Sequence, residues 1–120
     1  WDLYADEDAI IGPKETKLIS TGIAMAIPEG NVGLIWDRSS MGVKGIHRHA
    51  GVIDCGYRGE IKVCLHNAGA TLGSDSSYEI KKGDRIAQLL IQHIPDFSIS
   101  EVEILSTTTR GDGGFGSTGK

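Results

Sequence analysis

Residue types that suit phosphate binding cluster in the stretch DRSSMGVKG, where Arg38 is followed directly by Ser39 and Ser40. Hydroxyls and exposed amides at such a turn bind phosphate oxygens, and an arginine adds charge-assisted bonds that can be bidentate. The same residues also suit a short helix that an Asp or Ser side chain caps while Arg38 lies in solvent. Taken alone, the stretch leaves both interpretations open.

Two further stretches place a polar side chain next to an apolar pattern. In AGVIDCGYRGE, Asp54 follows a Val-Ile pair and lies three residues before Tyr57. Such an aspartate either forms a turn or serves as a positioned base. In GDRIAQLL, Gln88 interrupts an apolar strand pattern, so it either faces solvent by alternation or bonds to a buried group.

The end of the sequence, RGDGGFGSTGK, has five glycines among residues 111–119 and the spacing G-x-x-x-x-G-K from Gly114 to Lys120. A P-loop needs a helix and a Ser or Thr after the lysine, and Lys120 is the last residue, so we do not expect a P-loop. Glycines let backbone amides approach an anion closely. A tail without fixed structure in the free protein is the alternative.

Other catalytic and metal-binding patterns are weaker. His47 and His49 lie on one strand face, but the sequence pairs them with no carboxylate, which does not favour a zinc site. The two cysteines, Cys55 and Cys64, lie in strand-like sequence and fit no C-x-x-C pattern, which predicts reduced thiols in a cytosolic protein. No Ser or Cys lies in the glycine turn typical of a nucleophile elbow.

Composition indicates a globular domain of 120 residues, with 39% hydrophobic and 23% charged residues. The formal net charge of −4 argues against nucleic acid as the main partner, and no apolar run is long enough to span a bilayer. A polyanionic ligand must therefore be met by locally grouped cations or by a metal ion.

The chain reads as β-structure throughout, with one short helix predicted in SSMGVKG. β-Branched residues predict a strand over 17–28, a second strand is expected over 31–37, and alternation of apolar and polar residues predicts one over 59–69. Two strands are expected around the turn at 82–84, and a strand with looser alternation over 98–105. Short strands at this spacing are typical of a sandwich or a barrel. Residues 107–120 lack periodicity, so we expect one domain over 1–106 and an arm over 107–120.

In chain order, WDLYA, DRSSMG, GVIDCGYRGEI, GDRIAQLL and RGDGGFGSTG resemble the five ordered motifs of the trimeric dUTPase family. The resemblance covers almost the whole chain. It implies an all-β fold, a distorted β-barrel or jelly-roll with a flexible glycine-rich C-terminal arm, and a homotrimer with shared active sites. It also implies hydrolysis of dUTP to dUMP and pyrophosphate with Mg²⁺, which keeps uracil out of DNA and supplies dUMP for thymidylate synthesis.

The resemblance also assigns roles to individual residues. Asp54 corresponds to the base that activates the attacking water, and Asp2 to the aspartate associated with magnesium through water. The base and sugar would be held by Arg48, Gly51, Val52, Ile53, Tyr57, Lys62 and Phe115. The phosphates would be held by Arg38, Ser39, Ser40, Gln88, Arg110, Gly116, Ser117 and Thr118.

Some features depart from the family pattern or leave a rival open. The sequence starts inside the first motif, and Arg48 stands where some members have an asparagine near the base and water. A dCTP deaminase would carry a glutamate where Cys64 stands, which disfavours that enzyme. A non-catalytic dUTP-binding regulatory protein on the same fold is the main alternative, although Asp54, Gln88 and Arg110 are all present. A cytoplasmic location is the default expectation, with nuclear, organellar or viral origin left open.

Overall fold

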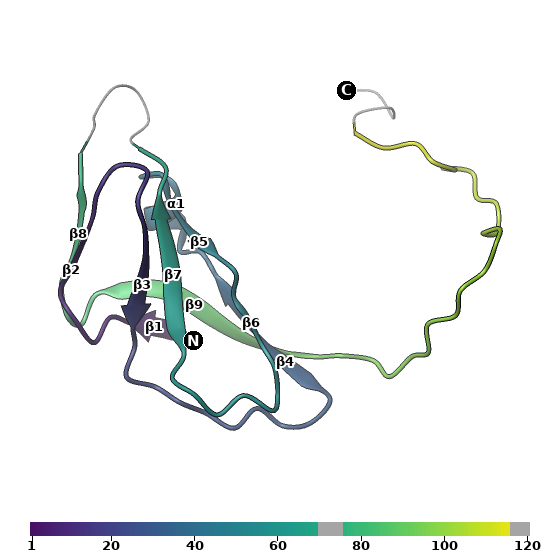
Figure 1. Cartoon of the computed structure of the whole chain (residues 1–120), viewed down its shortest axis with the longest axis horizontal. Helices are drawn as coiled ribbons and strands as arrows, with labels where there is room; N and C mark the ends of the chain where they lie inside the picture. Colours follow the sequence, from purple (N-terminus) through teal and green to yellow (C-terminus); the bar gives the residue numbers. More distant parts are fainter. Residues whose placement is uncertain (70–75, 116–120) are drawn as a thin grey trace.

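The computed structural model describes residues 1–69 and 76–115, and these form a β-protein with one short helix (Figure 1). In chain order the elements are β1 (Asp2–Tyr4), β2 (Ala9–Ile11), β3 (Thr16–Ser20), β4 (Asn31–Trp36), α1 (Ser39–Gly42), β5 (Ile46–His49), β6 (Val52–Ile53), β7 (Lys62–Asn67), β8 (Tyr78–Ile80) and β9 (Arg85–His93). The predicted all-β class and the predicted short helix are both confirmed. Within the described residues, no helix has the length and apolar character to cross a membrane.

The strands form three antiparallel sheets, with the orders β1-β9-β4-β6, β3-β7-β5 and β2-β8. The long strand β9 lies between β1 and β4, and Gln88 on β9 is paired with Asp2 on one side and with Trp36 on the other. The first and fourth motifs therefore lie side by side in this sheet, and Trp36, the residue before the second motif, lies on the other side of Gln88.

One apolar core holds the sheets together. The alternation predicted in the 59–69 segment is confirmed, since Ile61, Val63 and Leu65 are at most 2% exposed while the residues between them face outward. Ile19 from β3 and Leu89 from β9 pack in the same cluster. Burying an aliphatic side chain of this size contributes about 1.5–3 kcal/mol, so this core holds the strands that carry the site in place.

The strand predicted over 17–28 is shorter than expected, because β3 ends at Ser20. Beyond it, Gly22 adopts a positive φ of 67° and donates its amide to the Glu60 carboxylate at 2.9 Å. The Thr21 hydroxyl donates to the carbonyl of Ile61. Side chains thus replace the strand ladder at this point and tie residues 20–23 to residues 60–61.

The strand predicted over 98–105 is absent from the single chain. The segment leaves β9 and runs away from the sheets (Figure 1), and Ile99 and Ile104 are 90% and 86% exposed. The radius of gyration is 18.7 Å, whereas a compact chain of this length is expected at about 14 Å. The segment pairs with no strand among the described residues.

Candidate functional site

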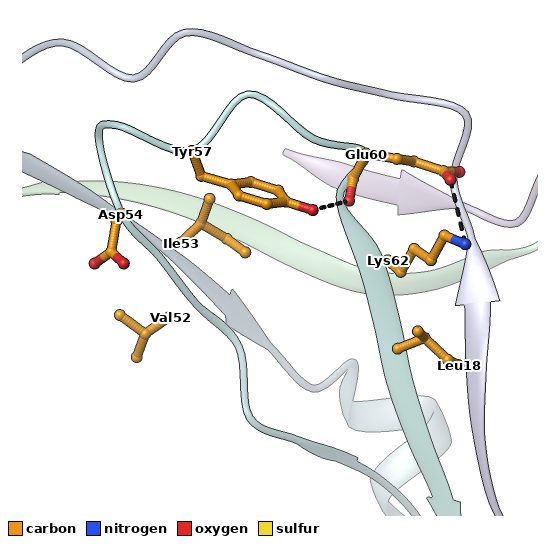
Figure 2. Close-up of a pocket in the computed structure, with 7 residues that line it drawn as sticks. All are labelled: Leu18, Val52, Ile53, Asp54, Tyr57, Glu60 and Lys62. Carbon is orange, nitrogen blue, oxygen red and sulfur yellow. Dashed lines mark hydrogen bonds and ion pairs between the residues drawn. The ribbon is translucent and has the colours of Figure 1, made fainter.

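A pocket of about 540 Å³ opens between the end of β3 and the hairpin of residues 46–67, in which β5 pairs with β7 and β6 lies in the connection between them (Figure 2). Its shape comes from segments that are distant in sequence but joined by the β3–β7 and β5–β7 pairings. The lining residues are Leu18, Val52, Ile53, Asp54, Tyr57, Glu60 and Lys62.

Between β5, which pairs with β7, and β6, which pairs with β4, the chain passes from one sheet to the other through two residues that both have left-handed φ angles, Ala50 at 59° and Gly51 at 113°. The carbonyl of Gly51 accepts a hydrogen bond from the amide of Ile35 at 2.8 Å, which ties the hairpin to β4. A Cβ on Gly51 would lie 3.1 Å from the carbonyl oxygen of Ile35. Glycine is therefore needed here both for its φ angle and for the close approach to β4.

Asp54 follows β6 directly and does two things at once. Its carbonyl accepts a hydrogen bond from the amide of Tyr57 at 3.0 Å, so its backbone begins a turn. Its carboxylate is exposed at one end of the pocket and points away from Glu60 and Lys62 (Figure 2). The turn that the sequence allowed is therefore present, and it leaves the carboxylate at the pocket.

At the opposite end of the pocket, Glu60 joins several groups. Its backbone carbonyl accepts a hydrogen bond from the Tyr57 hydroxyl at 2.9 Å (Figure 2). Its carboxylate accepts hydrogen bonds from the Ser20 hydroxyl and the Gly22 amide, and lies 3.5 Å from the Lys62 ammonium. The Ser20 hydrogen bond in particular, together with the Gly22 amide and Lys62, holds the pKa of Glu60 below its usual value.

A second polar cluster forms where β1, β9 and the start of α1 meet. Arg38 lies between the two strands: its Nε is 3.8 Å from an Asp2 oxygen, and its Nη1 donates to the carbonyl of Arg85 at 2.8 Å. Arg85 also lies 3.5 Å from Asp2. Gln88 is exposed and donates to the carbonyl of Asp37 at 3.4 Å. The structure thus brings together Asp2, Arg38 and Gln88, which the sequence placed in three separate motifs.

Residues at the start of α1 face a second, strongly polar pocket of about 560 Å³. Three cations, Arg38, Lys44 and Arg85, line this pocket together with Ser40 and two carboxylates, Glu79 and Asp84. Ser39 opens α1 and is exposed. No side chain caps the helix, so the alternative in which Asp or Ser caps it while Arg38 is merely solvated does not hold.

Arg48 does not line either of these pockets. Its guanidinium stacks over the Trp36 ring at 5.1 Å and donates to the carbonyl of Ala50, while its backbone amide donates to the Asp37 carboxylate at 2.7 Å. Asp37 also lies 3.7 Å from the His47 ring. Arg48 thus holds the hairpin against Trp36 at the end of β4. In residues 1–69 and 76–115, no three His, Cys, Asp or Glu side chains are grouped for a metal ion.

The described residues of the arm, 107–115, lie away from both pockets (Figure 1). The Arg110 side chain donates to the carbonyl of Gly113 at 3.0 Å, and Phe115 is fully exposed with a φ of 50°. Gly116, Ser117 and Thr118 lie outside the described residues. Cys55, expected in a strand, lies in the turn after β6, and both cysteines are free.

The sequence reasoning missed three residues that help to build the site: Leu18, Glu60 and Arg85. Leu18 reaches the pocket through the β3–β7 register, where it is opposite Cys64, and no local sequence signal marks this. Glu60 and Arg85 could have been found, because Glu60 lies in the same motif as Asp54 and Arg85 lies in the same motif as Gln88.

Comparison with known proteins agrees with this arrangement. A family model described as dUTPase matches residues 1–119. The chain belongs to the dUTPase family. Deoxyuridine 5'-triphosphate nucleotidohydrolases of Corynebacterium glutamicum and Candida albicans are 48% and 47% identical, over 99% and 100% of this chain and 79% and 74% of their own lengths.

Solved dUTPase structures have the same fold. The dUTPase of Staphylococcus bacteriophage 80alpha with dUpNHpp superimposes with a TM-score of 0.86 at 32% identity, covering 99% of this chain and 85% of that one. The dUTPase of phage phi11 of S. aureus, described with a structural Mg(II) ion, has a TM-score of 0.74 at 28% identity, over 86% and 82% of the two chains. These matches confirm that the five motifs belong to a dUTPase fold.

Proposed function

We propose that this chain hydrolyses dUTP to dUMP and pyrophosphate. The observation that carries the proposal is the pocket that Asp54 and Tyr57 line together, in a chain that belongs to the dUTPase family. The relatives named as deoxyuridine triphosphate nucleotidohydrolases align over nearly the whole chain. The products are consistent with a role in excluding uracil from DNA and in supplying dUMP.

The hairpin selects the base. Main-chain groups from Gly51 to Asp54 bond the uracil edge, with Val52 and Ile53 forming the apolar wall and Lys62 on the returning strand. Fixed hydrogen-bond partners reject a mismatched base strongly, because a wrong base leaves buried polar groups unpaired. Phe115 stacks on uracil from the arm, a contact that is tolerant of base identity.

Tyr57 selects the sugar by packing its ring against deoxyribose, which leaves no room for a 2′-hydroxyl. Asp54 orients and deprotonates the water that attacks the α-phosphorus. A carboxylate is a weak base, so the position of the water and the stabilisation of developing charge supply much of the rate.

The cluster around Arg38 takes the phosphate chain. Ser39 and Ser40 donate to phosphate oxygens from the start of α1, and Gln88 does so from β9. Arg110, Gly116, Ser117 and Thr118 add the contacts of the arm. Arg48, included in this site by the resemblance, lies behind the hairpin and serves the base pocket by holding Ala50 rather than by touching the nucleotide.

Magnesium fits this arrangement as a companion of the triphosphate. The described residues offer no group of three ligands, but Mg²⁺ keeps several waters and is often held by one or two carboxylates plus substrate phosphates. Asp2 is the carboxylate next to the phosphate cluster, and it would hold the ion through water. When bound, the ion neutralises charge on the phosphates.

The active sites are shared within a homotrimer. In a single chain, Asp54 and Arg38 line two different pockets that have no residue in common. The apolar side chains of the 94–105 segment are exposed in a single chain. Large exposed apolar patches mark interaction sites, and this one suits contact with another copy of the chain. A second copy would therefore bring its Arg38 cluster to the Asp54 pocket, and the arm would reach a neighbour. The cytoplasm suits such an enzyme and its free thiols.

Subunit complementation tests the shared site. Asp54→Asn and Arg38→Ala proteins are each expected to be inactive, and a refolded equal mixture is expected to recover activity in about a quarter of its sites, because some interfaces then pair two intact residues. An inactive mixture that forms trimers would contradict sharing.

The chemistry itself is tested by Asp54→Asn alone. This variant is expected to bind dUTP with nearly normal affinity in equilibrium dialysis and to lose about 10³-fold or more in kcat, because the substrate contacts remain while the base is lost. Turnover close to that of the wild type would remove Asp54 from the role of base.

A further inference from the structure

The Tyr57 side chain needs a restraint if it is to act as a wall of the sugar site. It lies in a turn and is 45% exposed. An exposed aromatic side chain in a turn has several rotamers open to it, and holding one of them costs entropy. Selection against a single hydroxyl group depends on the ring staying in one place.

Two neighbouring residues fix the ring. The Tyr57 hydroxyl donates to the backbone carbonyl of Glu60 at 2.9 Å. The ring also lies over Gly59 so closely that a Cβ on this glycine would be 2.6 Å from the ring carbon Cζ. Gly59 has no positive φ angle, so a side chain at this position would displace the ring rather than strain the backbone.

The carbonyl that holds Tyr57 is itself anchored by the Glu60 side chain. The carboxylate oxygen Oε1 accepts hydrogen bonds from the Ser20 hydroxyl and from the Gly22 amide, at separations of 40 and 38 residues along the chain. The other oxygen faces the Lys62 ammonium at 3.5 Å. This network ties the loop that carries Tyr57 to the end of β3, a strand of the three-stranded sheet.

We propose that Gly59 and Glu60 are positioning residues that determine sugar specificity, acting through Tyr57. Gly59 gives the ring its space, the Glu60 carbonyl fixes the hydroxyl, and the Glu60 carboxylate fixes that carbonyl to β3. The inference rests on the proposed hydrolysis of dUTP, and the residues act on discrimination between deoxyribose and ribose. Figure 2 shows the Glu60 carboxylate turned toward Lys62 and away from Asp54, which separates it from the attacking water.

Three variants test this role, each assayed for kcat and KM with dUTP and with UTP. Glu60→Ala removes the anchor and is expected to lower the ratio of kcat/KM for dUTP to kcat/KM for UTP by about tenfold. A change of this size corresponds to the net free energy of one or two hydrogen bonds. Most of the change is expected in KM. Glu60→Gln keeps the acceptor Oε1 for Ser20 and Gly22 and is expected to keep wild-type discrimination. Gly59→Ala leaves the carboxylate intact, displaces the ring and is expected to lose discrimination as Glu60→Ala does.

Glu15→Ala is the matched control, because Glu15 also accepts a backbone amide, that of Gly12 at 2.6 Å, but lies outside the pocket. It is expected to leave the ratio unchanged. If Glu60→Ala fails to fold, Gly59→Ala decides alone.

Wild-type discrimination in both Glu60→Ala and Gly59→Ala would overturn the inference, as would a loss in Glu60→Gln equal to that in Glu60→Ala. A wild-type protein that leaves dUTP intact would instead contradict the proposed function, so the two failures are distinguishable.

Discussion

Gly51 offers the sharpest test of how the hairpin is built, through the substitution Gly51→Ala. Two costs arise at this position. A side chain at a φ of 113° is strained, and the new Cβ would lie 3.1 Å from the Ile35 carbonyl oxygen and 3.2 Å from the Ile35 Cβ. Because the first contact is with backbone, the hairpin must move away from β4 to relieve it.

Backbone strain of this kind costs roughly 1–3 kcal/mol, and overpacking a close contact adds a similar amount, so we expect the free energy of unfolding to fall by about 2–4 kcal/mol. Movement of the hairpin also shifts Val52 to Asp54, and a misplacement of about 1 Å can cost up to about a hundredfold in rate. We therefore expect kcat/KM for dUTP to fall by about tenfold or more.

Urea unfolding at a fixed protein concentration measures the first effect, because the stability of an oligomer depends on concentration. Gly42→Ala is the matched control: Gly42 lies in α1, has no positive φ, and a Cβ added to it would meet no other part of the chain within 4 Å. This control is expected to be neutral or stabilised by up to about 1 kcal/mol, since alanine favours a helix. A Gly51→Ala protein as stable as the control would refute the reasoning.

Three further perturbations follow from the structure. Asn67 is 2% exposed and its amide donates to the carbonyl of Ile11 at 3.0 Å, so Asn67→Ala should lower the free energy of unfolding by about 2–4 kcal/mol in urea unfolding. Asn31 is only partly buried, and Asn31→Ala should cost less than about 1 kcal/mol; equal losses would contradict this. Deleting the residues after Thr109 should abolish most turnover but leave the trimer intact in sedimentation, and dissociation would show that the arm is structural. Because folding lowers the pKa of Glu60 from 4.5, ionisation of this carboxylate adds stability above pH 4.5, and this added stability is lost as the pH falls through the lowered folded-state pKa. Glu60→Gln should therefore lose less free energy of unfolding than the wild type as the pH falls below 4.5. An equal loss in the two proteins would refute this.

Local patterns in the sequence predicted most of the body of the fold. Alternation in the 59–69 segment was enough to place Ile61, Val63 and Leu65 in the core, because one face of β7 is buried and the other is not. The end of β3 at Ser20 could not be predicted, because it depends on Glu60, a side chain from another part of the chain. The strand expected over 98–105 is absent, and Ile99 and Ile104 are exposed, so the apolar pattern alone was not enough to predict pairing.

The candidate site likewise contains some features that local sequence patterns predicted and others that they did not. The motif around Asp54 indicated a turn or a base, and the structure shows that the turn presents the carboxylate. The grouping of Asp2, Arg38 and Gln88 came from the resemblance and depends on strand pairings that no local pattern states. The position of Arg48 on the Trp36 ring was not predicted, since stacking of a cation on an aromatic ring leaves no periodic signal in the sequence.

Pyrophosphate release is the measurement that tests the central claim most directly. The protein is incubated in parallel with dUTP, dCTP, dTTP and UTP, first with magnesium and then with EDTA. The account predicts rapid release from dUTP alone, with the rate falling on chelation of magnesium. Equal release from all four nucleotides would contradict the roles of the hairpin and Tyr57, and a lack of release from dUTP would contradict the proposed function.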